Sequence, residues 1–230
     1  MIHRINSPHS VGRLNQPRVR AVDWWLAGGI SPSNCIAAYQ PKGAASYAAS
    51  LTDLSGAGND AYEGVAPDWD DVSGWRGDGS SMYLKTGITL KPKDTTQTTI
   101  VRFSDVGSAG NRYVFGCVTV GKRYALCPNF FGGVLYGYIF SNFNFGLGTA
   151  VLSGTVALGI NGNIFVDGLY YGGTDTSPSE ILTDEIFMLA VNNGGSPEAY
   201  SPAHIQAIAF YNTGISADQV LAVHTAMMAL

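Results

Sequence analysis

The stretch LTDLSGAGNDAYEG, residues 51–64, combines carboxylate, hydroxyl and amide side chains with glycines and holds few apolar side chains that could fill a core. Asp53 and Ser55 can hydrogen-bond nearby backbone amides, and the glycines can adopt positive φ. Asn59 tolerates the left-handed region of backbone space. A ligand site, a flexible linker and a well-defined turn are the alternatives, and we interpret the stretch as a turn that binds no ligand.

The composition predicts a turn-rich domain with a polar but sparsely charged surface. The chain has 230 residues, of which 29 are glycine and only 13% are charged. This length fits one large all-β domain or two small ones. The net charge of -4 at pH 7 argues against general nucleic-acid binding.

The three cysteines do not form a disulfide framework, because their number is odd and low. Cys117 and Cys127 could flank one hairpin, so a bridge between them stays open as an alternative to free thiols. No cysteine or histidine spacing indicates zinc.

Short apolar runs separated by turns follow from residue 35 onward and predict strands at spacings typical of a β-sandwich. The last segment, from Ile215, predicts a helix, because Ser216 and Gln219 have the spacing of a capping box. The expected strands are residues 35–39, 81–84, 96–103, 112–120, 122–127, 133–140, 149–160, 163–171, 185–191 and 204–211.

The segment from Asp53 to Asp60 resembles the D-x-S-G-x-G-N signature of concanavalin A-like lectin/glucanase domains, in their laminin-G-like branch. Three further stretches resemble that family in the same order, covering residues 74–84, 161–173 and 207–227. Asp167-Gly168 falls at the turn of the second of these stretches. The resemblance implies an all-β, concanavalin A-like jelly-roll sandwich with an extended N-terminal arm and a short C-terminal helix. The sandwich is expected to span residues 31–230. The resemblance says little about activity, because this fold carries many functions.

Residues 1–30 are predicted to form a basic arm and anchor. The first twenty residues contain Arg4, Arg13, Arg18 and Arg20 and no acidic residue, so this part carries +4 and the remainder -8. One reading is a frayed terminus. The other is an arm that lies on the acidic surface of a neighbouring protein. Trp24 and Trp25 favour docking, because two adjacent indoles are difficult to bury together in a short tail.

The stretch 21–54 is similar to the beginning of virion-associated proteins of tailed bacteriophages. This resemblance implies a capsid decoration protein or a tail or fibre component, with other virion proteins as partners. A homo-oligomer, such as a trimer, is expected. No apolar run of signal-peptide length follows the N-terminus, so we expect assembly into the virion in the cytoplasm of the bacterial host, without membrane insertion.

Aromatic side chains are concentrated in residues 129–146. Tyr136 and Tyr138 share one face of the expected strand. That face could pack in the core, contact another subunit, or stack against a sugar beside Asn142 and Asn144. The three alternatives remain open at this point.

The sequence predicts no enzyme and no cofactor. The E-x-D-x-x-E motif of the family's glucanases is absent, and no serine hydrolase signature occurs. Asp68, Asp70 and Asp71 form the one acidic cluster, which we interpret as a surface loop, with a calcium site and a catalytic role as the alternatives. His204 is expected in a strand at a sheet edge.

Three functions follow in order of preference. The first is a non-enzymatic structural protein of a virion that could also bind host-surface glycans. The second is a carbohydrate-binding, lectin-like module without a primary structural role. The third is a glycoside hydrolase or lyase.

Overall fold

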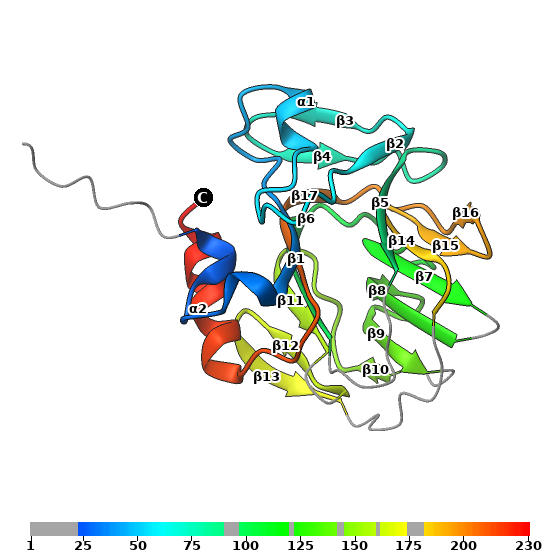
Figure 1. Cartoon of the computed structure of the whole chain (residues 1–230). Coiled ribbons are helices and arrows are strands. Elements are labelled where there is room, and N and C mark those ends of the chain that lie inside the picture. Colours follow the sequence, from blue (N-terminus) through cyan, green and yellow to red (C-terminus); the bar gives the residue numbers. More distant parts are fainter. Residues whose placement is uncertain (1–22, 90–96, 120–121, 142–144, 160–161, 174–181) are drawn as a thin grey trace, which may run out of the picture.

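The structure is a computed structural model that describes residues 23–89, 97–119, 122–141, 145–159, 162–173 and 182–230. Two large, mainly antiparallel sheets stack face to face, and one helix near the C-terminus lies on the outside of the first sheet (Figure 1). The predicted two-layer β-sandwich with a C-terminal helix is confirmed. The proposed arm, residues 1–20, lies outside the described residues.

The first sheet is centred on β17, which pairs with β6 along one side and with β4 and then β1 along the other. In spatial order it contains β13 (Leu169–Gly172), β12 (Ile164–Val166), β11 (Gly154–Leu158), β6 (Thr98–Ser104), β17 (His204–Tyr211), β4 (Gly74–Arg76) and β3 (Asp68–Asp70), with β1 (Cys35–Tyr39) beside β17.

The second sheet also carries a hairpin, β15 and β16, whose first strand runs parallel to β7. In spatial order this sheet contains β10 (Phe145–Leu147), β9 (Val134–Ser141), β8 (Lys122–Phe130), β7 (Phe115–Thr119), β14 (Glu185–Met188), β5 (Tyr83–Thr89) and β2 (Tyr62–Val65), with β15 (Val191–Asn193) and β16 (Ser196–Glu198) alongside.

The longest helix, α2 (Ala217–Met228), begins at the predicted capping box. The backbone N–H of Gln219 donates to Ser216 Oγ at 3.2 Å, and the backbone N–H of Ser216 donates to Gln219 Oε1 at 2.8 Å. Among the described residues, no helix is long and apolar enough to cross a membrane. The other helical segments are short: η1 (Trp24–Leu26), η2 (Pro32–Asn34) and α1 (Tyr47–Ser50).

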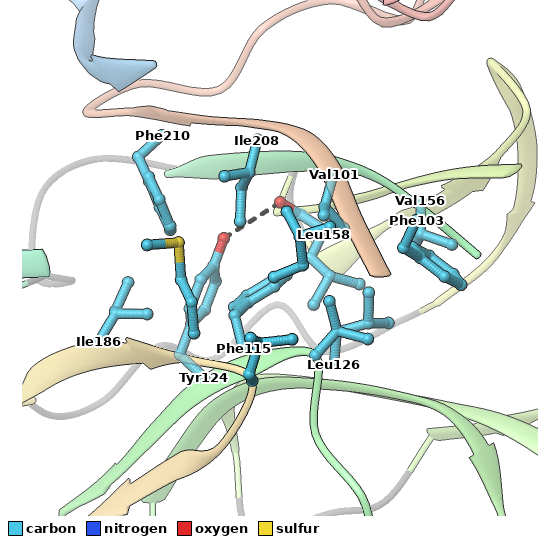
Figure 2. Close-up of a cluster of buried hydrophobic side chains, with 14 of the residues drawn as sticks. Val101, Phe103, Phe115, Tyr124, Leu126, Val156, Leu158, Ile186, Ile208 and Phe210 are labelled. Carbon is cyan, nitrogen blue, oxygen red and sulfur yellow. Dashed lines mark hydrogen bonds between the residues drawn. The ribbon is translucent and has the colours of Figure 1, made fainter. Parts of the chain in front are cut away.

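The main core lies between the two sheets and is filled by the inward side chains of both (Figure 2). Tyr124 crosses this core and is fully buried. Its hydroxyl donates to Thr99 Oγ1 at 2.8 Å and approaches the carbonyl of Leu158 at 3.2 Å. Because the buried hydroxyl has partners, the aromatic ring can fill the core without the cost of an unsatisfied polar group.

A second core lies on the outer face of the first sheet, where α2 and η1 cover it. Trp24 and Trp25 pack edge to face in this core and are only 4% and 9% exposed. The indole N–H of Trp24 donates to Gln40 Oε1 at 3.0 Å. The argument that these two indoles are difficult to bury together therefore does not hold, because α2 supplies a surface that covers both.

The stretch 51–64 forms the turn that its sequence predicts, and it is tied to β1. Asp53 Oδ1 accepts hydrogen bonds from the backbone N–H groups of Ala38 and Ser55, at 3.0 and 2.9 Å. Asp53 Oδ2 accepts from the hydroxyl of Ser55 and the backbone N–H of Asn59, at 2.9 and 3.1 Å. The amide of Asn59 donates to the carbonyl of Ile36 at 2.7 Å. The polar groups of the loop hydrogen-bond one another and the backbone of β1, and these bonds fix the loop to that strand.

Two sequence expectations differ from the structure. The acidic stretch was expected to be a surface loop, but it forms a hairpin of β3 and β4. The hairpin is held because Trp69 packs against the core and because Gly74 supplies the positive φ that the turn needs. Cys117 faces the main core, whereas Cys127 faces a small cluster on the other side of the second sheet. Both thiols are free and buried, so the alternative of a bridge between them is wrong.

Candidate ligand-binding site

Helix α2 covers only part of the outer face of the first sheet. The backbone N–H of Ile215, just before the helix, donates to Thr98 Oγ1 at 3.3 Å at the start of β6. At the other end of the helix, Arg102 Nη1 donates to the carbonyl of Met227. The helix therefore runs along β6 and ends near Arg102. Past this end, polar side chains line the outer face of the sheet.

The strand register brings these side chains into neighbouring positions. Arg102 pairs across the sheet with Thr155 on β11, while His204 on β17 pairs with Ser104 on β6. A β-bulge interrupts the register of β17 at Gln206. We call this region the polar face. Its members are Asp68, Asp70, Arg76, Arg102, Ser104, Thr155, His204 and Gln206, of which Thr155 is covered by α2.

A groove lies where the polar face meets the end of α2. It consists of one hollow of about 490 Å³ and an adjoining one of about 310 Å³, which share Ser153. The first volume falls in the range of about 300–1,000 Å³ that small-molecule sites occupy. The first hollow is lined by Arg102, Phe103, Ser104, Ser153, Gly154, Asp167, Gln206, His224 and Met228. The second is lined by Asp105, Val106, Gly107, Leu152 and Ser153.

One wall of the groove is fixed by Thr155. Its backbone N–H donates to Asp167 Oδ1 at 2.9 Å, and its hydroxyl lies 2.8 Å from His224 Nδ1. Gly154 is required beside it, because a Cβ at that position would lie 2.4 Å from Asp167 Oδ1 and its φ is +124°. The turn predicted at Asp167-Gly168 is confirmed, and it places the Asp167 carboxylate in the groove.

Arg102 is a half-buried cation in the same groove. Burial lowers the pKa of its guanidinium, because desolvation disfavours the charged form. Within the described ranges, no aspartate or glutamate side chain lies within 4.0 Å of this group, although Asp167 lines the same hollow. The guanidinium is held by backbone oxygens of Met227 and Leu230 at and just beyond the end of α2.

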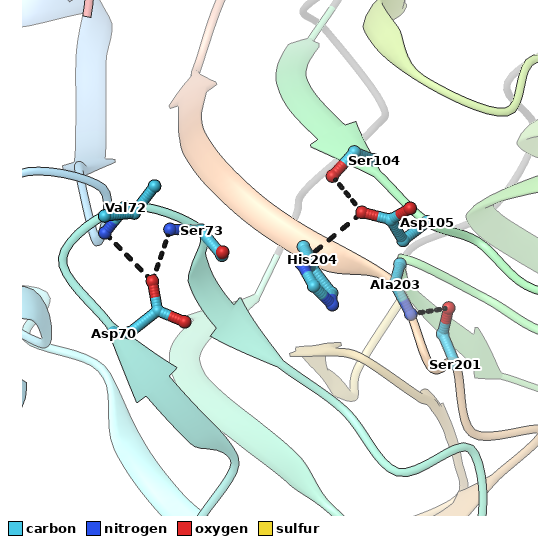
Figure 3. A network of polar contacts seen from close by, with 8 residues as sticks. All are labelled: Asp70, Val72, Ser73, Ser104, Asp105, Ser201, Ala203 and His204. Carbon is cyan, nitrogen blue, oxygen red and sulfur yellow. Dashed lines mark hydrogen bonds and ion pairs between the residues drawn. The ribbon is translucent and has the colours of Figure 1, made fainter.

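His204 lies between two carboxylates on the polar face (Figure 3). Its Nδ1 is 3.6 Å from Asp105 Oδ2, which also accepts the hydroxyl of Ser104 at 2.8 Å. On the other side, Asp70 accepts the backbone N–H groups of Val72 and Ser73. The bond from Ser73 contributes most to the lowered pKa of Asp70, and His204 adds a smaller effect. His204 thus sits inside the sheet between β4 and β6, not at the edge where the sequence placed it.

The acidic cluster is engaged in local contacts. Asp68 accepts a hydrogen bond from Arg76 Nη2 at 2.5 Å, while Asp70 closes the β3–β4 turn. Asp71 is exposed. In the part of the chain that the structure describes, no group of three or more histidine, cysteine or acidic side chains is arranged to hold a metal ion.

The predicted aromatic face is on the outside of the second sheet. Tyr138 is only 1% exposed and Tyr136 is half-buried. The ring of Phe130 lies 4.4 Å from that of Tyr136 and 5.2 Å from that of Phe131, which is 64% exposed. We call Phe130, Phe131 and Tyr136 the aromatic strip. Asn142 and Asn144, expected beside it, lie outside the described residues.

Of the residues predicted to anchor the arm, the structure describes only the two tryptophans. Arg4, Arg13, Arg18 and Arg20 lie outside the described residues, and the indoles of Trp24 and Trp25 are buried beneath α2. The polar side chains of the groove were not predicted as ligand contacts. The one signal in the sequence is that Arg102 is the only charged residue in the apolar stretch TQTTIVRF.

Comparison with known proteins identifies the fold and no closer relationship. No protein-family model matches the chain, and no curated protein matches it. Domain 4 of AbnA, a GH43 extracellular arabinanase from Geobacillus stearothermophilus determined in complex with arabinotriose, is similar over 83% of this chain and 98% of its own, with 14% identity and a TM-score of 0.56. A mutant Trypanosoma rangeli sialidase displaying trans-sialidase activity is similar over 86% of this chain, with 11% identity and a TM-score of 0.63.

A mutant of HCR/D is similar over 84% of this chain, with 11% identity and a TM-score of 0.56. The match spans 34% of the sialidase and 52% of HCR/D, so this chain corresponds to one part of each of those proteins. At these identities the likeness concerns the β-sandwich fold alone.

Proposed function

We propose that this chain is a non-catalytic carbohydrate-binding module that holds a saccharide in the groove of the first sheet. The observation that carries the proposal is the groove itself, which combines a ligand-sized hollow with convergent polar side chains. Asp167 and His224 on its wall are held in place by Thr155, so they are pre-organised for a ligand.

The chemistry of the groove suits a saccharide. Sugar hydroxyls both donate and accept hydrogen bonds, and Asp167, Gln206 and Ser153 offer acceptors and donors at one hollow. Met228 and Leu152, which are 50% and 57% exposed, offer apolar surface for the C–H groups of a sugar ring. The complex of the arabinanase domain with arabinotriose supports the proposal, since a domain of similar fold and extent is found there with a saccharide.

A glycan array with the purified chain tests this function. We expect binding to a subset of saccharides, and we expect the double variant Gln206→Ala, Ser153→Ala to weaken it about tenfold, since each lost hydrogen bond contributes about 0.5–1.5 kcal/mol. Phe131→Ala is the matched control, because it removes an exposed side chain from the aromatic strip on the other sheet. A loss confined to Phe131→Ala would move the site to that strip, and no binding across a broad panel would reject the function.

The same assay separates binding from hydrolysis or lyase activity. A binding module returns its saccharide intact, so the bound glycans are recovered and their chain lengths compared with the input. Shortened products that disappear in Asp167→Asn would favour the glycoside hydrolase or lyase alternative.

The basic arm favours a second candidate function, that of a structural component of a phage virion. Four arginines without an acidic residue in the first twenty positions suit attachment to an acidic protein surface. Deletion of residues 1–20 is expected to abolish attachment to the particle and to leave the module folded. Attachment that survives this deletion would reject the anchoring role.

A further inference from the structure

Arg102 differs from the other arginine of the polar face because no aspartate or glutamate side chain in the described ranges forms an ion pair with it. Arg76 is exposed and forms an ion pair with Asp68 at 2.5 Å. Arg102 is half-buried, and within the described residues only the carbonyls of Met227 and Leu230 accept hydrogen bonds from it. A guanidinium has five N–H donors, and both of these bonds come from Nη1. Nε and Nη2 therefore keep donors for which the described chain supplies no acceptor.

The position of Arg102 brings these remaining donors into the groove. It lies on β6 between Thr155 and Ala207, and the end of α2 closes over one side of it. Removing a cation from water without a counter-ion is unfavourable, and a carboxylate or similar anion that binds there offsets this cost. A planar guanidinium with two adjacent donors matches the two oxygens of a carboxylate.

The part of the groove beside β11 carries the opposite charge. Asp167 Oδ1 accepts a backbone hydrogen bond, and its carboxylate can accept further hydrogen bonds from hydroxyl groups. Ser153 also lines the hollow, and Gln206, on β17, lines it on the side of Arg102 away from β11. A ligand that contacts all of these side chains carries an anionic group for Arg102 and hydroxyl groups for Asp167, Gln206 and Ser153.

We infer that the groove selects acidic saccharides, in which the carboxylate of a sugar-acid residue binds Arg102 and the ring hydroxyls bind Asp167, Gln206 and Ser153. This inference rests on the proposed function, and it assigns the ligand class and the residue that discriminates it. Neutral saccharides of the same skeleton bind more weakly, because they offer the guanidinium no carboxylate.

The test compares each acidic oligosaccharide with its own neutral form. Oligogalacturonate, a hyaluronan oligosaccharide and sialyllactose are titrated into the full chain by calorimetry, each before and after chemical reduction of the carboxylate to a primary alcohol. We expect at least one acidic form to bind about tenfold or more tightly than its reduced form, since a hydrogen bond to a charged group contributes more than a neutral one. Added salt is expected to weaken the acidic form selectively.

Variants assign the effect to one residue. Arg102→Gln is expected to remove the preference for the acidic form, while Arg102→Lys keeps the charge and part of the preference. Arg76→Gln is the matched control on the same face and is expected to leave the preference unchanged. Circular dichroism confirms that each variant is folded, and the comparison of acidic and reduced ligands on the unmodified chain needs no variant.

The outcomes separate the two proposals. Equal affinity for the acidic and reduced forms would overturn the inference and leave the carbohydrate-binding function standing. A preference that persists in Arg102→Gln would also overturn it. If none of the six saccharides binds but the glycan array reports neutral ligands, only the inference falls, and if the array is also empty, both fall.

Discussion

Asp53 shows how one buried carboxylate organises a loop that contributes little apolar surface. It is 7% exposed and accepts hydrogen bonds from Ala38, Ser55 and Asn59. Asp53→Ala is expected to lower the free energy of unfolding by about 2–4 kcal/mol, because it leaves several buried donors without acceptors. Urea unfolding followed by tryptophan fluorescence measures the change. Asp71→Ala, at an exposed position, is the control and should stay within about 0.5 kcal/mol. Equal stability of both variants would contradict the conclusion that the Asp53 hydrogen bonds stabilise the loop.

Asp78 adds a pH dependence at the residue scale. Desolvation raises the pKa of its carboxyl, but hydrogen bonds from Ser80, Ser81 and Met82 lower it by more. The pKa of Asp78 is therefore well below its ordinary value of 3.8. A lowered pKa in the folded state stabilises the fold above the pKa of the unfolded chain, and this stabilisation is lost as the pH falls below 3.8.

Asp78→Asn is therefore expected to be less stable than the unmodified chain at neutral pH. The difference should shrink on acidification to about pH 3, where unfolded aspartate takes up a proton. Chemical unfolding of both proteins at each pH checks the sign. A difference that grows with acidification would show that the carboxylate is not stabilised by these hydrogen bonds.

At the scale of elements, the capping box sets the start of α2 and hence the position of the helix on the first sheet. Ser216→Ala is expected to lower the free energy of unfolding by about 1 kcal/mol, since the backbone N–H of Gln219 loses its acceptor. Ser216→Asn keeps an acceptor at the same place and should remain close to the unmodified chain. Thermal unfolding distinguishes the two, and equal losses in both would indicate that the side-chain cap contributes nothing.

The elements that the sequence predicted correctly are those with local signals. The capping box of α2, the turn at Asp167-Gly168 and the strands over 35–39 and 204–211 depend on neighbouring residues, and they appear as expected. The β3–β4 hairpin was missed because its strands have three residues each and carry acidic side chains. Propensity is weak evidence over so short a length.

The groove could not be predicted from the sequence for a different reason. Arg102, Asp167, Gln206 and His224 are far apart in the chain, and each comes from a different element. They meet because β17 lies between β4 and β6, because a bulge displaces Gln206, and because α2 ends above Arg102. Such long-range pairing leaves no periodic pattern near any one of these residues.

At the scale of the whole molecule, the two sheets share one core, and among the described residues a helix packs only on the outer face of the first sheet. The covered half of that face is apolar and packs against Trp24 and Trp25 of η1, whereas the other half is polar and forms the groove. Helix α2 thus contributes both to stability and to the binding site. A change that loosens η1 from α2 should consequently disturb the groove as well as the fold.

Two N-terminal deletions test this dependence and distinguish the arm from the packed segment behind it. Deletion of residues 1–20 retains Trp24, Trp25 and Ile30, so we expect the urea midpoint to stay close to that of the full chain. Deletion of residues 1–30 removes all three side chains from the core beneath α2. We expect this to cost about 3 kcal/mol or more, as for other losses of large buried side chains.

The single substitution Trp25→Ala in the full chain separates loss of packing from loss of chain length. It is expected to destabilise the protein and to weaken saccharide binding together, since the same helix holds the wall at His224. If deletion of residues 1–30 leaves the urea midpoint unchanged, the indoles contribute no stability and the second core is not a cooperative part of the fold. If Trp25→Ala destabilises the chain but leaves binding intact, α2 supports the sheet without shaping the groove.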